Sequence, residues 1–163
     1  MNFNYIYKKY NYMNWAFDIT VKNRKLLNHF LENFSLEELN KVPDGFNNNI
    51  IWNIAHTIVT QQLLVYKLSG LPMLVSDEMV AAYSKGTKTE KDVTQAEVDA
   101  IKNLLFSTLK KTEDDYKTKI FKNYHEYTVS TNSTLRNVEE AIEFNNFHEG
   151  IHLGYILALK KSL

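Results

Sequence analysis

Two histidines near the end of the sequence have the spacing of metal ligands. His148 and His152 lie four residues apart in a segment with helical periodicity. Four residues advance an α-helix by about 400°, so both imidazoles project from the same side, one turn apart. At this spacing, two imidazoles can bind one metal ion.

The string from His148 to His152 also fits the H-E-x-x-H pattern of zinc proteases. The extended form of that pattern requires Gly and His where this chain has Tyr155 and Ala158. Other proteases of this type use a downstream acidic ligand, but none of the eleven residues after His152 is Glu, Asp or His. We therefore expect that the protein is not a protease of this class and that a third ligand lies upstream.

His56 is the natural upstream candidate, on the same stripe of an apolar helical segment as Trp52 and Leu63. Three imidazoles with an open position are typical of catalytic zinc sites, although imidazole also binds nickel, copper and iron. The alternative is that the three are core histidines, each with a hydrogen-bond partner, because an unpaired buried imidazole costs free energy. For His29 and His125 we expect no functional role.

Glu149 is the nearest candidate for a catalytic role, in proton transfer or in support of the metal ligands. It lies about 100° around the helix from His148, so the favoured interpretation is that it faces solvent or a partner subunit. Asn145 and Tyr155 fall on the side of His148 and His152 and could orient an imidazole or a bound water. Core packing is the favoured role for Tyr155.

The composition excludes several kinds of site and partner. The chain has 163 residues and no cysteine, so a metal must be held by His, Asp or Glu, and neither disulfides nor thiolate ligands are available. Nineteen basic residues balance nineteen acidic ones, which argues against nucleic-acid binding.

No apolar run approaches the ~20 residues of a membrane span, and no signal peptide is evident. We therefore expect a cytoplasmic protein without membrane association.

Periodicity and capping signals predict four long helices, in the ranges 10–34, 48–69, 94–120 and 137–163. Shorter helical turns are expected at 35–40 and 76–83, a polar loop at 84–92 and a short extended piece near 127–129. The first helix is expected to bury one apolar face, formed by Trp15, Ile19, Leu26, Phe30 and Phe34. The sequence thus predicts one all-α domain over residues 1–163, a four-helix bundle with negligible strand content.

The tyrosines near the start of the chain, Tyr5, Tyr7, Tyr10 and Tyr12, are rich in apolar surface. Aromatic residues are enriched at interfaces. We expect this segment to pack across the bundle or at a dimer contact.

Together these features resemble the DinB-like (DinB/YfiT-type) superfamily of four-helix metal proteins. The likeness rests on His56 within I-W-N-I-A-H-T, on the H-x-x-x-H of the last helix, and on the K-L-S-G-L-P exit that ends at Pro72. The resemblance implies a bundle of up-down-down-up topology, with a divalent metal, zinc or nickel, held by His56, His148 and His152. It also implies a homodimer.

The resemblance further suggests a metal-dependent enzyme of the thiol S-transferase or hydrolase type, acting on a small molecule. Its partner would be a low-molecular-weight thiol such as bacillithiol or mycothiol. A metal-binding or interaction module without catalysis is the alternative. The substrate, the reaction and the choice of metal do not follow from the residues.

Overall fold

The computed structural model describes the backbone of residues 3–163 and the side chains of residues 12–163. Its long helices are α1 (Phe3–Asn33), α3 (Ile50–Gln62), α5 (Gln95–Lys117) and α6 (Val138–Lys160), and α3 continues into a π-helical turn, η1 (Leu63–Lys67). The shorter elements are α2 (Leu36–Asn40), α4 (Asp77–Tyr83) and the antiparallel strands β1 (Tyr127–Thr128) and β2 (Thr134–Leu135). The predicted all-α class is confirmed.

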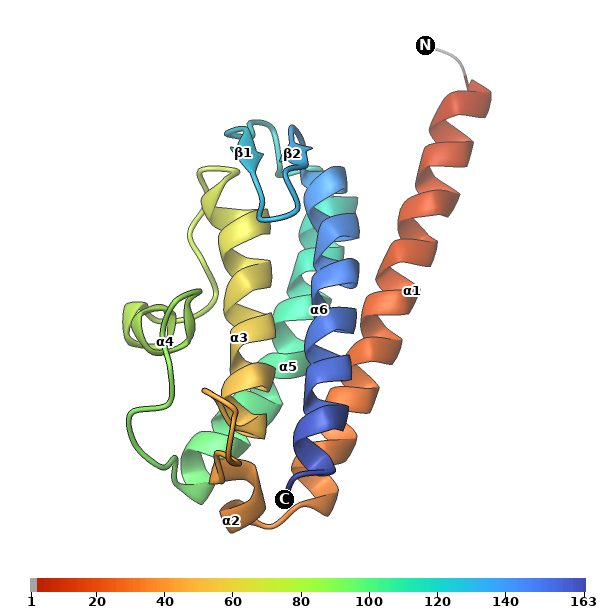
Figure 1. The fold of residues 1–163 in the computed structure, drawn as a ribbon. Coiled ribbons are helices and arrows are strands. Elements are labelled where there is room, and N and C mark those ends of the chain that lie inside the picture. Colours follow the sequence, from red (N-terminus) through yellow and green to blue (C-terminus); the bar gives the residue numbers. More distant parts are fainter. Residues whose placement is uncertain (1–2) are drawn as a thin grey trace.

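The long helices pack side by side, as Figure 1 shows. Helix α6 lies against both α1 and α3, and α5 contacts the same two helices from the other side. Figure 1 also shows that α1 and α6 run in one direction, while α3 and α5 run in the opposite direction. Among the described residues, no helix combines the length and the hydropathy that a membrane span requires.

Local sequence signals place several helix ends. Ser35 and Thr94 form capping boxes with Glu38 and Glu97, and Asn137 caps α6 through its side chain. Each cap satisfies backbone N–H groups that have no partner within the helix. The predicted starts near residues 35, 94 and 137 are therefore confirmed, whereas α1 begins earlier than predicted and α5 ends at Lys117 rather than near residue 120.

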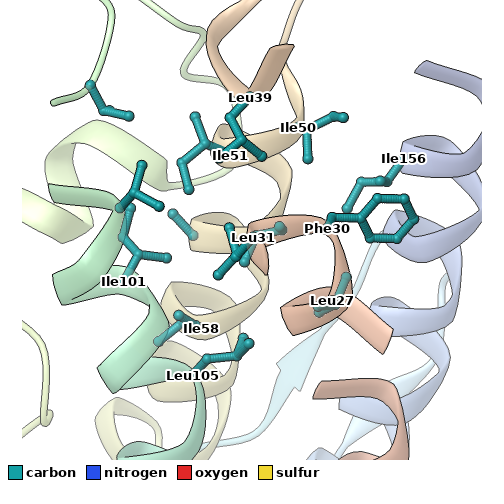
Figure 2. Close-up of a cluster of buried hydrophobic side chains, with 14 of the residues drawn as sticks. Leu27, Phe30, Leu31, Leu39, Ile50, Ile51, Ile58, Ile101, Leu105 and Ile156 are labelled. Atoms are coloured by element: carbon teal, nitrogen blue, oxygen red, sulfur yellow. The ribbon is translucent and has the colours of Figure 1, made fainter. Parts of the chain in front are cut away.

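A buried apolar cluster joins one half of the bundle. Leu27 and Phe30 of α1 meet Ile58 of α3, Leu105 of α5 and Ile156 of α6 within this cluster (Figure 2). A second buried cluster joins the helices in the other half of the bundle, and it includes Met13, Phe17, Val65, Leu109 and Ile142. The first cluster packs α6 against α3, the two helices that carry the candidate metal ligands, and the second packs α6 against η1, which continues α3.

The apolar face predicted for the first helix is wrong at two positions. Trp15 and Leu26 are 61% and 52% exposed. The buried stripe of α1 instead includes Thr20 and Arg24, at helical spacing with Leu27. These two polar residues hide the stripe from a search for apolar periodicity.

The tyrosine-rich start of the chain lies mostly outside the described side chains. The side chains of Tyr5, Tyr7 and Tyr10 are not among those that the structure describes. Tyr12 is described and is 51% exposed. The packing predicted for this segment stays a prediction.

Candidate metal centre

Three imidazoles converge where α3 faces α6. The ring centroid of His56 lies 5.1 Å from that of His148 and 4.7 Å from that of His152, and the last two are 4.5 Å apart. Each residue offers a ring nitrogen within 4.8 Å of the others, so one ion could contact all three. In the part of the chain that the structure describes, no other group of three His, Asp or Glu residues meets this condition.

His56 is fixed by its surroundings on α3. Its Nδ1 lies 2.6 Å from the backbone carbonyl oxygen of Tyr83, at the end of α4, and its ring stacks on Trp52 at a centroid distance of 4.7 Å. A carbonyl oxygen can only accept, so Nδ1 carries the proton and Nε2 keeps its lone pair. This is the tautomer that a metal ligand needs.

His152 is oriented in the same way by a side chain of α3. Its Nδ1 lies 2.8 Å from Oδ1 of Asn53, and the Asn53 amide group donates to the carbonyl of Asn49 at 2.7 Å. The second bond identifies the amide orientation, so the oxygen of Asn53 accepts from His152. Nε2 of His152 is thereby left free to bind an ion.

The third imidazole has an unsatisfied nitrogen. Nδ1 of His148 is buried and has no hydrogen-bond partner among the described residues. A buried polar atom without a partner costs free energy, and an ion bound to Nδ1 would offset this cost. The donor set of three imidazoles, two of them with committed Nδ1–H groups, fits a divalent transition metal.

All three imidazoles are held in the neutral form. Burial lowers the pKa of His148 to about 3, with smaller contributions from the charged forms of His152 and His56 and from Arg24. Burial and His56 lower the pKa of His152 to about 4. Burial also lowers the pKa of His56, against the opposing effect of its bond to Tyr83. Neutral imidazole is the form that binds a metal.

The triad lies in the wall of a cavity of about 650 Å³. One face of α3 and η1 forms one wall, and α6 contributes its histidines together with Phe144, Ile151 and Tyr155. Residues 85–87, after α4, also line the cavity, as do Tyr127, Val129 and Ser130 around β1. This volume is within the range of small-molecule sites, so an ion at the triad would be accessible to a bound molecule.

Comparison with known protein families agrees with this arrangement. The family model of the DinB superfamily matches residues 19–156, a span that contains His56, His148 and His152. The chain belongs to the DinB superfamily. No curated protein matches this DinB superfamily chain.

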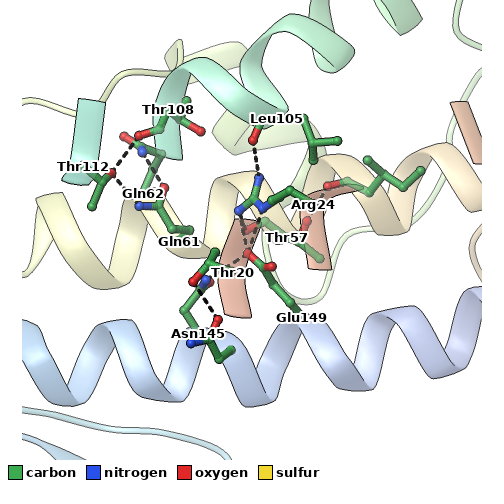
Figure 3. Close-up of polar contacts among 12 residues, drawn as sticks. Thr20, Arg24, Thr57, Gln61, Gln62, Leu105, Thr108, Thr112, Asn145 and Glu149 are labelled. Atoms are coloured by element: carbon green, nitrogen blue, oxygen red, sulfur yellow. Dashed lines mark hydrogen bonds and ion pairs between the residues drawn. The ribbon is translucent and has the colours of Figure 1, made fainter. Parts of the chain in front are cut away.

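The orientation expected for Glu149 in this DinB protein is wrong. Its side chain is fully buried, and Oε1 accepts from Nε and Nη2 of Arg24 at 2.8 and 2.7 Å (Figure 3). Asn145 donates to the same oxygen at 2.9 Å. Glu149 therefore faces the interior between α6 and α1, where its charge is compensated, and it does not line the cavity.

The other expectations for the site have mixed outcomes. Asn145 bonds Glu149 rather than an imidazole. Tyr155 does not pack in the core: it is 37% exposed, lines the cavity and meets Phe46 edge to face. His29 and His125 are both exposed and lie outside the triad.

Sequence reasoning missed two groups that orient the ligands, Asn53 and the carbonyl of Tyr83. Asn53 had a detectable signal, since it is a polar residue inside the apolar run from Ile50 to Ala55. The carbonyl of Tyr83 had no such signal in the sequence. Every residue carries a backbone carbonyl, and only the fold brings this one to His56.

Replacing Asn53 by alanine is expected to weaken zinc binding by about 10- to 100-fold, as loss of a group that orients a metal ligand does. The imidazole of His152 would lose the acceptor that fixes its tautomer. Competition with a chromophoric chelator would measure the affinity. Asn53→Asp keeps an acceptor oxygen and should bind zinc more tightly than Asn53→Ala, whereas wild-type affinity in Asn53→Ala would contradict this role.

The metal-free protein is expected to lose stability as the pH falls below about 6.5. In the unfolded chain the histidines take up protons near pH 6.5, but in the folded chain His148 and His152 do so only near pH 3 and pH 4. The unfolded state thus binds more protons in this window, and the free energy of unfolding should fall by about 2–4 kcal/mol between pH 7 and pH 5.

Urea unfolding of chelator-treated protein at both pH values would measure this loss. The His148→Gln variant should show a smaller decrease, because one of the two groups is gone. A stability that is unchanged or higher at pH 5 would contradict the assigned protonation states.

Proposed function

We propose that this protein is a divalent-metal-dependent enzyme that acts on a small molecule bound in the cavity over the histidine triad. The observation that carries this proposal is the convergence of three neutral imidazoles in the wall of a 650 Å³ cavity. His56, His148 and His152 would hold the ion, and zinc or nickel suits a set of three nitrogen donors. Such an ion, when bound, lowers the pKa of a coordinated water or thiol and supplies positive charge.

The protein's own residues would position the ligands and the substrate. Tyr83 and Asn53 fix two imidazoles, so the triad needs little rearrangement. The hydroxyl of Thr60 lies in the cavity lining and donates to Nε2 of His56 at 3.3 Å; an ion on Nε2 would release this hydroxyl to bond a substrate. The apolar part of the lining excludes water from the bound molecule.

Thiol S-transfer is the reaction class we favour, with hydrolysis as the second candidate. The sequence contains no cysteine, so the thiol would come from a cosubstrate such as bacillithiol or mycothiol. In the transfer, the thiol sulfur bonds to an electrophilic carbon, the leaving group departs with the bonding electrons, and the thiol proton passes to solvent. No side chain of this protein can therefore serve as the thiol nucleophile.

The test is a thiol transfer assay on zinc- and nickel-loaded protein, with bacillithiol and 1-chloro-2,4-dinitrobenzene as substrates. Metal-dependent acceleration should disappear in His148→Ala and persist in His29→Ala, which changes an exposed histidine outside the site. A hydrolytic activity would appear with 4-nitrophenyl acetate in the same preparations. Rates that are the same in loaded, chelated and His148→Ala protein, despite tight metal binding, would favour the non-catalytic metal-binding module.

We further propose that Glu149 has a structural role, as one half of a buried ion pair, and is not a proton-transfer group. Its carboxylate is fully buried against Arg24, outside the cavity lining. The double variant Arg24→Met/Glu149→Leu removes the carboxylate and its partner together. Turnover within a few-fold of wild type is expected, whereas a loss of about 10²–10⁴-fold with zinc binding intact would indicate proton transfer by Glu149.

The finer structural expectations are also proposals. The directions of the four long helices in Figure 1 support the up-down-down-up topology.

A homodimer is supported by exposed apolar residues on α1 and α6, among them Trp15 and Phe147. Light scattering coupled to size-exclusion chromatography would give the mass in solution, and a monomer would contradict this proposal. A cytoplasmic location remains a prediction from the sequence.

A further inference from the structure

The cavity over the triad has an uneven charge. Across the chain, acidic and basic residues are equal in number, at nineteen each. The cavity lining, in contrast, includes Lys67 and Lys85 but no Asp or Glu. The three histidines are neutral, so a divalent ion held there would add positive charge that no ligand carboxylate offsets.

Both lysines are available to a bound molecule. Lys67 ends η1, and Lys85 lies in the turn that follows α4. Their side chains are exposed, and within the described structure neither forms an ion pair with an acidic residue. Among the described side chains, most of the lysine ion pairs join residues four apart on one helix, for example Lys22 with Asp18.

The turn that carries Lys85 is anchored to the metal site. The Thr87 hydroxyl lies 2.8 Å from the carbonyl oxygen of Ala82, and the indole N–H of Trp52 donates to Thr87 at 3.2 Å. Trp52 in turn stacks on His56. Gly86 has a φ of +92°, a conformation that residues with a Cβ rarely adopt, which explains the glycine beside Lys85. The ammonium group is thus presented from a defined turn on the same side as the triad.

The remainder of the lining is largely apolar. It includes Leu63, Leu64, Val129, Phe144 and Ile151. Such surface gains free energy when it is covered by an apolar body rather than by water. An occupant that suits both features carries an apolar portion and a negative charge.

We propose that the cavity selects small molecules with an apolar body and an anionic group, and that Lys67 and Lys85 bind the anionic group. This inference rests on the proposed function in taking the cavity as the substrate site. It makes the two lysines specificity-determining residues, which orient a substrate with its charged end at the cavity rim and its other end toward the triad.

Two fluorescent probes of similar shape test the proposal. 8-Anilinonaphthalene-1-sulfonate carries one negative charge, and N-phenyl-1-naphthylamine lacks the sulfonate. Titrations of the metal-free protein, and of the protein with one equivalent of zinc, would give a dissociation constant for each probe. In Lys67→Met/Lys85→Met, binding of the sulfonate should weaken by about three- to tenfold, the effect of losing two exposed ion pairs, while binding of the neutral probe stays the same.

A matched control changes two lysines elsewhere. Lys25→Met/Lys161→Met removes the same charge from exposed positions outside the cavity, and it should leave both constants unchanged. Amide NMR shifts on adding the sulfonate should fall on residues 85–87 and 127–130. Equal effects of the two double variants, no measurable sulfonate binding by the wild type, or shifts confined to other surfaces would overturn the inference.

The probe measurement does not need the metal, so the two proposals can fail separately. Sulfonate binding that is equally strong in the wild type and in Lys67→Met/Lys85→Met would overturn the role of the lysines and leave the metal-dependent function standing. Absence of zinc binding would contradict the proposed function, even if the metal-free cavity prefers the anionic probe.

Discussion

Replacing His148 by alanine should weaken zinc binding at least about 100-fold. Structural zinc sites with four ligands bind with about 10–16 kcal/mol, or roughly 3 kcal/mol for each ligand, and 3 kcal/mol corresponds to a factor of about 150. Among the described residues, His148 is one of three His, Asp or Glu side chains within reach of a shared ion. Its loss would leave His56 and His152, which come from different helices and would hold an ion less tightly.

The affinity would be measured by competition with a chromophoric chelator at pH 7. His29→Ala is the matched control, because this exposed imidazole lies outside the triad and its Nδ1 accepts from the side-chain amide of Asn33 at 3.0 Å. The alanine variant at residue 148 also removes a buried unsatisfied nitrogen, so its metal-free form should fold. Zinc binding of equal strength in both variants would contradict the proposed ligand set.

Replacing Glu149 by alanine should lower the free energy of unfolding by about 3–5 kcal/mol. The side chains of Arg24 and Glu149 are both fully buried, and the variant would leave the guanidinium without its carboxylate. The remaining contacts of Arg24, with the carbonyls of Leu105 and Thr57, are long, at 3.5 Å each. They cannot compensate for a buried unpaired charge.

Urea unfolding would measure this loss, with Asp18→Ala as the control. Asp18 pairs with Lys22 on the exposed side of α1, and breaking an exposed pair should cost less than about 1 kcal/mol. The double variant Arg24→Met/Glu149→Leu should be more stable than Glu149→Ala, since it leaves no unpaired charge in the interior. A Glu149→Ala variant within 1 kcal/mol of wild type would contradict the assignment of a strong buried pair.

The same ion pair explains why parts of the fold could not be predicted from the sequence. Arg24 and Glu149 are 125 residues apart, and each alone is typical of a solvent-exposed helix face. Only their pairing makes burial tolerable, and nothing local signals it. Because apolar periodicity passes over Arg24, the predicted stripe of α1 includes Trp15 and Leu26, which are exposed, in place of Thr20 and Arg24. Glu149 is predicted to face outward because it lies about 100° around α6 from His148, and nothing local signals its partner in the interior.

The triad was predictable because its information is local. A four-residue spacing fixes how His148 and His152 project from one helix, and the apolar stripe around His56 indicates which way that helix faces. The helix starts at Thr94 and Asn137 were predictable for the same reason, since caps act within three residues. The carbonyl of Tyr83 and the placement of Lys85 depend instead on how residues 71–93 fold back over α3.

The central claim is that His56, His148 and His152 jointly bind one metal ion. Anomalous diffraction from crystals of the zinc-loaded protein, collected on both sides of the zinc absorption edge, tests it most directly. The account predicts a single strong peak at about 2.0–2.1 Å from a nitrogen of each of the three imidazoles. No peak at the triad under saturating zinc, or a peak that lacks one of the three histidines, would contradict it.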